Sequence, residues 1–202
     1  MLPIFSWILF LVFCLPAQIN LSGQTADWEL RKDQDGIKVY TRAEKESFLD
    51  EFRGEAMIPA SIDRLVQILH DADHMKDWIP DCADSRLISL GKDEQYHYLV
   101  SSLPFPLHNR DTYVQFKYVW SADGLTVIIT GLPDYGPEED GLVRIPHLTG
   151  FWIFKRVSEM QTHTTYQVLA DPGGAVPIWL ANSTTVSTPF NTLKNLRKYV
   201  QK

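Results

Sequence analysis

The stretch DPGGAVPIWLAN, residues 171–182, places two glycines and two prolines around the start of an apolar triplet at 178–180. From Pro172 the chain carries no charged residue until Lys194. A neutral segment of this length near the end of a globular chain must be buried, inserted into lipid, or closed over something apolar. The rest of the sequence favours one of these three outcomes.

The neutral segment belongs to a long helical pattern that runs from about 177 to 199. Apolar residues recur there at spacings of three, four and seven, as one face of an α-helix requires. Pro189 lies inside the pattern and predicts a kink. Gly173 and Gly174 precede the helix and leave the backbone free, so we expect a hinge that lets the helix lift.

Upstream of this helix, the sequence predicts mostly strands. A helix at 61–72, capped by Ser61, and a short helical turn at 74–78 interrupt them. In the segment 47–58, alternation puts Phe52 on a buried face and Glu51 on a face toward water. Strands are predicted at 36–42, 47–58, 85–90, 94–102, 110–120, 125–130, 142–146, 150–157 and 162–170.

The strands are joined by short turns, so we expect consecutive strands to be antiparallel neighbours in an α+β fold. The C-terminal helix is the only predicted element long enough to cover the concave face of a curved sheet. A sheet covered in this way cannot bury its concave face against itself. Either large side chains fill that space or a cavity remains. Because the helix presents a neutral face, closure over something apolar is the favoured outcome.

Composition limits the classes of function. The chain has 202 residues, 45% of them hydrophobic and 12% aromatic, which indicates one globular domain. Nineteen basic residues against 25 acidic ones give a net charge of −6, which argues against nucleic acid as a partner. We expect a monomer.

The first 24 residues differ from the rest. No charge occurs before Asp27, and an apolar run extends from about residue 2 to 15. This length suits a signal peptide better than a membrane span, although the missing basic residue and cleavage motif leave a retained anchor open. We expect an exported protein, periplasmic or secreted, with a domain over residues 25–202.

Several short motifs then become informative together. They are WIPDC at 78–82, LPFP at 103–106, NRD at 109–111, ADPGG at 170–174 and PIWLAN at 177–182. In this order and spacing the chain resembles the steroidogenic-acute-regulatory-related lipid-transfer (START) domains, in particular their exported bacterial members. The resemblance implies a helix-grip fold, in which a curved antiparallel sheet wraps around the C-terminal helix and encloses an apolar tunnel for one lipid.

The candidate ligand-binding residues follow from these patterns and from the resemblance. Aromatic and aliphatic side chains with few polar groups are typical walls for apolar ligands. Arg110 either pairs structurally with Asp111 or holds a lipid head group, and Phe105 forms either packing or an entrance lip that touches membrane. The candidates are Trp78, Tyr98, Phe105, Arg110, Trp152, Trp179, Val186 and Phe190.

Other chemistry is weakly indicated. HDADH at 70–74 has metal-ligand spacing but lacks a third ligand, so we predict no metal, no cofactor and no catalytic constellation. A helix-grip aromatase/cyclase is the alternative, with Arg110 and an inward Tyr96, His97 or Tyr98 as acid–base groups. A ligand sensor is the third reading. We expect lipid binding for transfer or sensing, with transient membrane contact.

Overall fold

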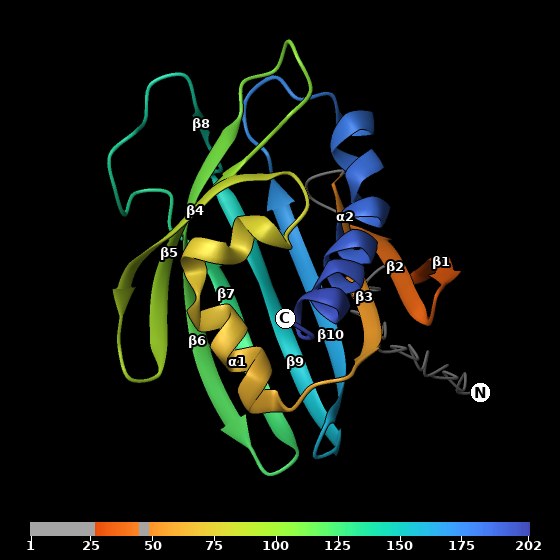
Figure 1. Ribbon diagram of the computed structural model, residues 1–202. Coiled ribbons are helices and arrows are strands. Elements are labelled where there is room, and N and C mark those ends of the chain that lie inside the picture. Colours follow the sequence, from red (N-terminus) through yellow and green to blue (C-terminus); the bar gives the residue numbers. More distant parts are fainter. Residues whose placement is uncertain (1–26, 45–48) are drawn as a thin grey trace, which may run out of the picture.

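The computed structural model describes residues 27–44 and 49–202 (Figure 1). The predicted export or anchor segment, residues 1–24, and the first two residues of the predicted strand 47–58 lie outside the described residues. Two α-helices and a 3₁₀-helix accompany the strands: α1 (Ile62–His70), η1 (Ala72–Asp77) and α2 (Ile178–Tyr199). The strands are β1 (Glu29–Gln34), β2 (Ile37–Ala43), β3 (Asp50–Ile58), β4 (Cys82–Leu90), β5 (Glu94–Ser101), β6 (Arg110–Ser121), β7 (Gly124–Gly131), β8 (Val143–Arg144), β9 (His147–Ser158) and β10 (Gln161–Asp171).

All these strands belong to one sheet, in the order β1-β2-β3-β10-β9-β7-β6-β5-β4, with β8 paired to β6 outside this path. Both α-helices lie over the same face of the sheet, which we call the inner face (Figure 1). The predicted α+β class and helix-grip arrangement are therefore confirmed, because the sheet curves around its C-terminal helix.

Three local expectations are corrected. Strand β1 was not predicted, since ELRKDQ is an exposed edge strand with one apolar residue. Strand β8 runs parallel to β6 and is not an antiparallel neighbour of the strands next to it in sequence. Glu51 does point to the outer face, but it is only 8% exposed because Arg42 and Gln167 bind its carboxylate.

Helix α1 is held at its start by a side-chain cap. The Ser61 hydroxyl accepts a hydrogen bond from the Arg64 amide at 3.2 Å, which satisfies one of the free N–H groups of the first turn. Its buried face, with Leu65 and Leu69 at helical spacing, packs onto the inner face of the sheet. The core therefore lies between the sheet and the two helices.

Candidate functional site

The inner face contains a cavity of about 60 Å³ between the sheet, the end of α1 and the corner at Met75–Ile79. Its walls are apolar or aromatic, and none of the residues that line it carries a charge. Trp78 and Trp152, two of the predicted ligand-binding residues, lie in this wall. The lining residues are Leu69, Met75, Trp78, Ile79, Leu99, Val114, Phe116, Ile129, Leu148, Trp152, Tyr166 and Val168.

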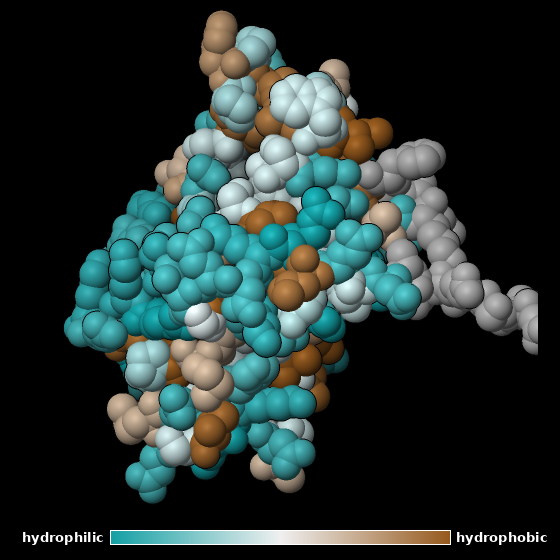
Figure 2. All heavy atoms as spheres, turned by 90° about the vertical axis from the view of Figure 1, so that its right-hand side faces the viewer, coloured by the Kyte–Doolittle hydropathy of each residue, from teal (hydrophilic) through white to brown (hydrophobic). Residues whose placement is uncertain are grey.

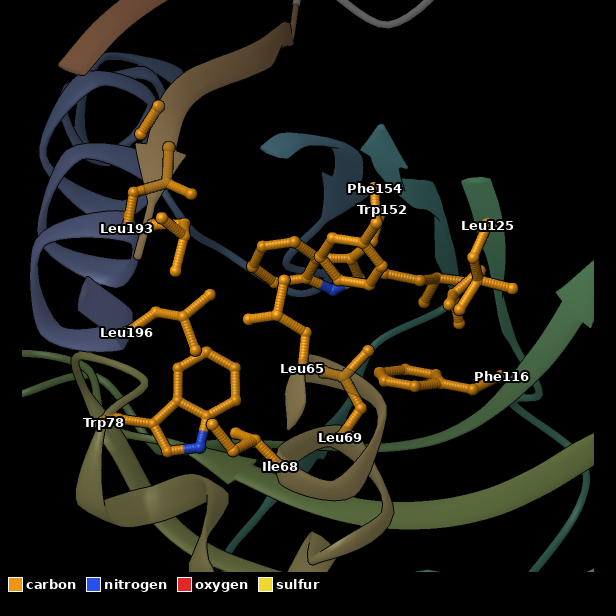
Figure 3. Close-up of a cluster of buried hydrophobic side chains, with 14 of the residues drawn as sticks. Leu65, Ile68, Leu69, Trp78, Phe116, Leu125, Trp152, Phe154, Leu193 and Leu196 are labelled. Carbon is orange, nitrogen blue, oxygen red and sulfur yellow. The ribbon is translucent and has the colours of Figure 1, made fainter. Parts of the chain in front are cut away.

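The cavity is small for a lipid. Sites for drug-sized ligands are typically about 300–1,000 Å³, so the interior is nearly filled by side chains in this conformation. Leu193 and Leu196 from α2, Leu65 and Leu69 from α1, and Phe116 from β6 point into the same space (Figure 3). A larger guest requires part of this cover to move.

Aromatic rings form the most rigid part of the wall. Trp152 stacks on Tyr166 with ring centroids 4.0 Å apart, and Trp78 lies 6.2 Å from Trp152. The carbonyl of Trp78 accepts a hydrogen bond from the Asn195 amide of α2 at 3.0 Å. This contact fixes the second half of α2 against the corner that carries Trp78.

A buried polar group of three residues adjoins the cavity on the inner face. The Tyr118 hydroxyl donates to Gln95 Oε1 at 2.7 Å, and Gln95 Nε2 donates to the Leu69 carbonyl at 3.1 Å. Gln95 Nε2 also contacts His97 Nε2, and the His97 ring lies 4.4 Å from that of Phe116. Burial lowers the pKa of His97 to about 4, so the imidazole is neutral at neutral pH.

Tyr98 does not line this cavity. Successive residues of a strand face opposite sides of a sheet, so His97 and Leu99 face inward and Tyr98 faces outward. There Tyr98 packs against Tyr113 at 4.9 Å, in a second cluster with Val100. Burial, with the nearby carboxylate of Asp111, raises the pKa of Tyr98 to about 12.

Arg110 does not pair with Asp111. Its guanidinium donates to the carbonyls of Pro172 at 2.9 Å and Gly173 at 3.1 Å, and also to that of His108. Burial lowers the pKa of Arg110. The side chain thus fastens the loop before α2 to the loop between β5 and β6.

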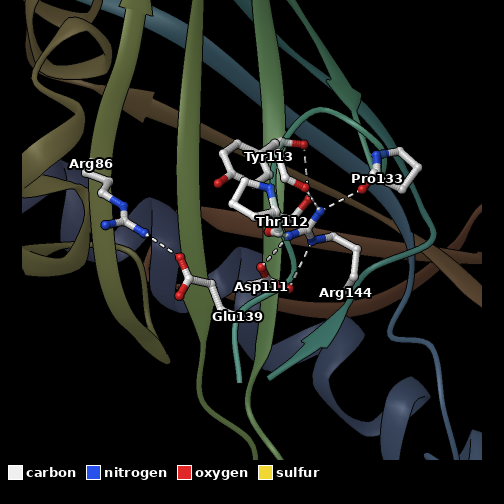
Figure 4. A network of polar contacts seen from close by, with 9 residues as sticks. Arg86, Asp111, Thr112, Tyr113, Pro133, Glu139 and Arg144 are labelled. Atoms are coloured by element: carbon white, nitrogen blue, oxygen red, sulfur yellow. Dashed lines mark hydrogen bonds and ion pairs between the residues drawn. The ribbon is translucent and has the colours of Figure 1, made fainter. Parts of the chain in front are cut away.

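Asp111 is bound instead by Arg144, through two contacts of 3.0 and 2.8 Å (Figure 4). The same guanidinium donates to the carbonyls of Pro133, Gly136 and Pro137. This network holds the 132–146 segment on the outer face of the sheet. The two arginines therefore organise loops on opposite sides of one strand end.

Helix α2 has two unlike halves. Between residues 178 and 188 only Thr185 is buried, whereas Pro189, Phe190, Thr192, Leu193 and Leu196 are buried beyond it. Two of the predicted ligand-binding residues, Val186 and Phe190, lie on this helix without lining the cavity. Val186 packs against the edge of the core, and the Phe190 ring is covered by the Lys32 ammonium at 3.6 Å. We call residues 178–188 the lid segment.

Side-chain hydroxyls of the lid segment bond to their own helix. Ser183, Thr184 and Thr185 each donate to a carbonyl three residues earlier, at 2.7–2.8 Å. This back-bonding competes with the regular helical ladder, and Pro189 removes one further donor. The lid segment is therefore the less firmly held half of α2.

Phe105 and Trp179 lie at the same end of the molecule. Phe105 is 97% exposed in the β5–β6 loop, and Trp179 and Ile178 at the start of α2 are 72% and 49% exposed. In Figure 1 that loop and the start of α2 share the upper end, where Figure 2 shows hydrophobic residues gathered. We call these three residues the apolar tip.

Sequence reasoning missed most of the cavity wall, including Leu69, Val114 and Phe116. Their alternation in β6 and their spacing in α1 mark them as inward-facing, but nothing in the sequence shows where neighbouring core residues leave a gap. Within the described chain no cluster of three or more His, Cys, Asp or Glu side chains could hold a metal ion. Neither described helix is long and apolar enough to span a membrane.

Comparisons with known proteins agree with this architecture. A family model described as the START domain matches residues 19–202. A solved STAR-related lipid transfer protein from Xanthomonas axonopodis is 45% identical with a TM-score of 0.82, covering 87% of this chain and 99% of that one. An uncharacterized protein of Pseudomonas aeruginosa is 37% identical over 87% of this chain and 88% of its own length. The phosphatidylcholine transfer protein of Mus musculus is 26% identical over 87% and 85%. The chain belongs to the START domain family.

Proposed function

We propose that this protein binds one hydrophobic molecule between the sheet and its helices and carries it between apolar phases. The observation that supports this most directly is the wholly uncharged lining of the cavity, which extends to the aromatic pair Trp152 and Tyr166. Burying an alkyl chain contributes roughly 0.8 kcal/mol per methylene. About a dozen buried methylenes would therefore outweigh the ordering costs of binding.

Entry requires the lid segment to move. In the lid segment one residue is buried, and Asn182 accepts a hydrogen bond from the Asp50 amide at 3.1 Å. The second half of α2 is mostly buried on one side and is also tied by Asn195 to the Trp78 carbonyl and by Arg197 to the carbonyls of Asp35 and Gly36. Gly173 and Gly174 both have positive φ, at 65° and 62°, in the loop that leads into the helix. We infer that the first three turns lift about this loop while the second half stays in place.

The apolar tip is the proposed contact with membrane. An exposed Trp and Phe at one end suit the boundary between lipid tails and water. The tip adjoins the entrance, since Arg110 joins the β5–β6 loop to the loop before α2. A guest leaving through the lid segment would then pass into lipid without crossing water.

The enzyme reading has less support. It requires an inward acid–base pair, yet Tyr96 and Tyr98 face outward and the Arg110 donors bind backbone carbonyls. Of the three β5 candidates only His97 faces inward, its side-chain contacts are with Gln95 and Phe116, and the charged group that acts on it is the exposed carboxylate of Asp73 in η1. We therefore favour binding and transfer over catalysis.

The first 24 residues keep their proposed role in export or anchoring. The support is their sequence alone, which contains no charged residue and is largely apolar. Determining the N-terminal residue of the protein isolated from its own host tests this. A first residue between 18 and 27 indicates cleavage, and an intact residue 1 in the membrane fraction indicates an anchor.

A vesicle assay tests the central proposal. Donor vesicles carry a pyrene-labelled phospholipid, sterol or long-chain alcohol, and acceptor vesicles carry none. We expect catalytic amounts of the protein to accelerate the movement of at least one probe, seen as loss of excimer fluorescence. Transfer of all three at the spontaneous rate would contradict the proposal.

A further inference from the structure

We propose that the guest is an uncharged lipid whose polar end is a hydrogen-bond acceptor, a hydroxyl or carbonyl oxygen, received by the Nδ1–H group of His97. This inference rests on the proposed function and specifies the chemical class of its ligand. Three features of the inner face support it: the lack of a buried cation free to pair, the unused polar atoms, and the position of the proton on the His97 ring.

The first feature is the electrostatics of the interior. Among the described residues, three charged side chains are buried: Glu51, Arg110 and Asp111. Glu51 and Asp111 bind Arg42 and Arg144 on the outer face, and Arg110 binds loop carbonyls. An anionic head group on the inner face would therefore find no buried cation free to pair with it among the described residues, and the one charge that acts on His97, that of Asp73, would repel it. Burying an unpaired charge is strongly unfavourable.

The second feature is a set of polar atoms that lack partners. Four neutral side chains on or against the inner face each bury an atom with no hydrogen bond: Trp78 Nε1, His97 Nδ1, Thr164 Oγ1 and Thr192 Oγ1. Buried polar groups are almost always satisfied, so an unsatisfied one calls for an explanation. A ligand atom that completes the hydrogen bond supplies one, because Trp78 itself lines the cavity.

The third feature is that the neighbours of His97 determine which nitrogen carries its proton. The Leu69 carbonyl can only accept, so the Gln95 atom facing it is the amide nitrogen, and the same nitrogen meets His97 Nε2. His97 Nε2 is then the acceptor, which leaves the proton on Nδ1. The unused atom is a donor, as is Trp78 Nε1, so the ligand group that fits is an acceptor.

The position of His97 relative to the cavity matches this role. It shares the inner face of β5 with Leu99, and its ring packs on Phe116; both of these residues line the cavity. Its low pKa keeps the ring neutral, so it offers a hydrogen bond without a charge. His97 itself lies behind the wall formed by Leu99 and Phe116, so in this proposal the guest enlarges the cavity on that side and its polar end meets the ring.

The test compares two pyrene-labelled chains of equal length at pH 7, one ending in a hydroxyl and one in a carboxylate. The carboxylate must either enter the cavity as an unpaired charge or first become protonated. At pH 7 protonation is unfavourable because the pKa of a carboxylic acid in water is well below 7, and its cost weakens binding by on the order of a hundredfold. We expect the full-length protein to bind the alcohol at least about tenfold more tightly in a fluorescence titration.

Variants then test the role of His97. We expect His97→Phe to weaken alcohol binding about tenfold and His97→Gln, which keeps a donor, to retain most of it. His163→Phe on the outer face of β10 is the matched control and should change neither affinity. Far-UV circular dichroism and thermal unfolding establish that each variant is folded.

The outcomes separate the inference from the proposed function. Failure of both chains to bind would overturn the proposed function. Carboxylate binding equal to or tighter than alcohol binding would overturn the inference while leaving the proposed function in place. Alcohol affinity that is unchanged in His97→Phe would overturn the assignment to His97.

Discussion

At the residue scale, Arg110 shows how one side chain links the sheet to the lid. Its three carbonyl partners lie in two loops that meet at the apolar tip, His108 in one and Pro172 and Gly173 in the other. A guanidinium with its donors bound in this way orders backbone and leaves little capacity for a lipid head group. Its role in the proposed mechanism is to hold the hinge closed.

Replacing Arg110 with leucine should therefore loosen the hinge. Loss of hydrogen bonds from a buried charged donor predicts a fall of about 2–4 kcal/mol in the free energy of unfolding, measured in urea. Hydrogen exchange should accelerate at residues 172–180. Arg86→Leu is the control, because its exposed contact with Glu139 contributes about 1 kcal/mol or less. Equal stability and exchange in the two variants would contradict this role.

His97 also predicts how stability depends on pH. Its pKa is about 4 in the folded protein and about 6.5 when unfolded, because burial outweighs the opposing effect of Asp73 and His70 acts in the same direction as burial. The unfolded chain then binds more protons between these values, so stability is complete above pH 6.5 and is lost as pH falls toward 4.

We expect His97 to account for a decrease of up to about 3 kcal/mol in unfolding free energy across that window. Denaturation of wild type and His97→Gln at pH 7, 5.5 and 4.5 measures it. The wild-type free energy should fall more steeply, since carboxylates titrate alike in both proteins. Parallel pH curves would show that His97 is not titrating as described.

Residue-level sequence reasoning predicted Trp78 and Trp152 in the ligand-binding wall, and both line the cavity, but it selected Tyr98 where its neighbour His97 faces inward. These neighbours alternate in β5, and both sides of that strand are buried because the 132–146 segment covers the outer face. Burial on both sides removes the polar–apolar alternation that normally identifies the inner face. The face of Tyr98 therefore followed only from the three-dimensional structure.

At the element scale, the division of α2 is the main finding. The helix could be predicted from the sequence because it depends on local periodicity. The expected effects of Pro189 and of the two glycines before the helix could also be stated, because they depend on backbone chemistry alone. It did not predict that burial is concentrated after residue 188, since that depends on which strands lie beneath each turn. Strand β1 was missed because it has one apolar residue and no alternation. The strand predicted at 142–146 exists as β8, but its parallel pairing with β6 depends on the path of the chain between β7 and β9.

Two engineered cross-links should distinguish the halves of α2. Cysteines at Asp50 and Asn182, whose backbone amide and side chain lie 3.1 Å apart, would tie the lid segment to β3 as a disulfide. Cysteines at Asp35 and Lys194, whose side chains form an ion pair at 3.6 Å, would tie the second half to the β1–β2 turn through a short bismaleimide, which replaces the length of the lysine side chain. Both variants carry Cys14→Ser and Cys82→Ser, which removes the two native cysteines.

Oxidation of the 50–182 pair should abolish lipid transfer between vesicles, and reduction should restore it. Bismaleimide cross-linking of the 35–194 pair should leave transfer within about twofold of the unlinked protein, because that half is already fixed. Mass spectrometry confirms each cross-link. Unimpaired transfer with the 50–182 bridge closed would show that the lid segment is not the entrance.

At the scale of the whole molecule, entrance, hinge and apolar tip lie together at one end. Strand β6 runs from Arg110 at this end to Trp120 at the other, and Trp120 is also 53% exposed. A protein that bound membranes through any exposed aromatic residue would use both Trp120 and the apolar tip. The proposed exit of the guest through the lid segment requires membrane contact at the apolar tip only.

Substituting the tip should therefore slow transfer without weakening binding. Phe105→Asp with Trp179→Asp should reduce the transfer rate at least about tenfold, because two apolar anchors are lost at the bilayer surface. An acidic residue in the first turn of α2 is compatible with the helix dipole. Affinity for a ligand in solution and thermal stability should be retained. Trp120→Asp is the control, and an equal effect there would contradict a directional tip.

The most direct test of the central claim is native mass spectrometry of the protein purified from its own host. We predict a mass increase equal to one hydrophobic molecule per chain, lost on delipidation and regained when an uncharged lipid is added. A protein that carries no such mass, and that takes up none of the phospholipids, sterols, fatty acids and alcohols offered after delipidation, would contradict it.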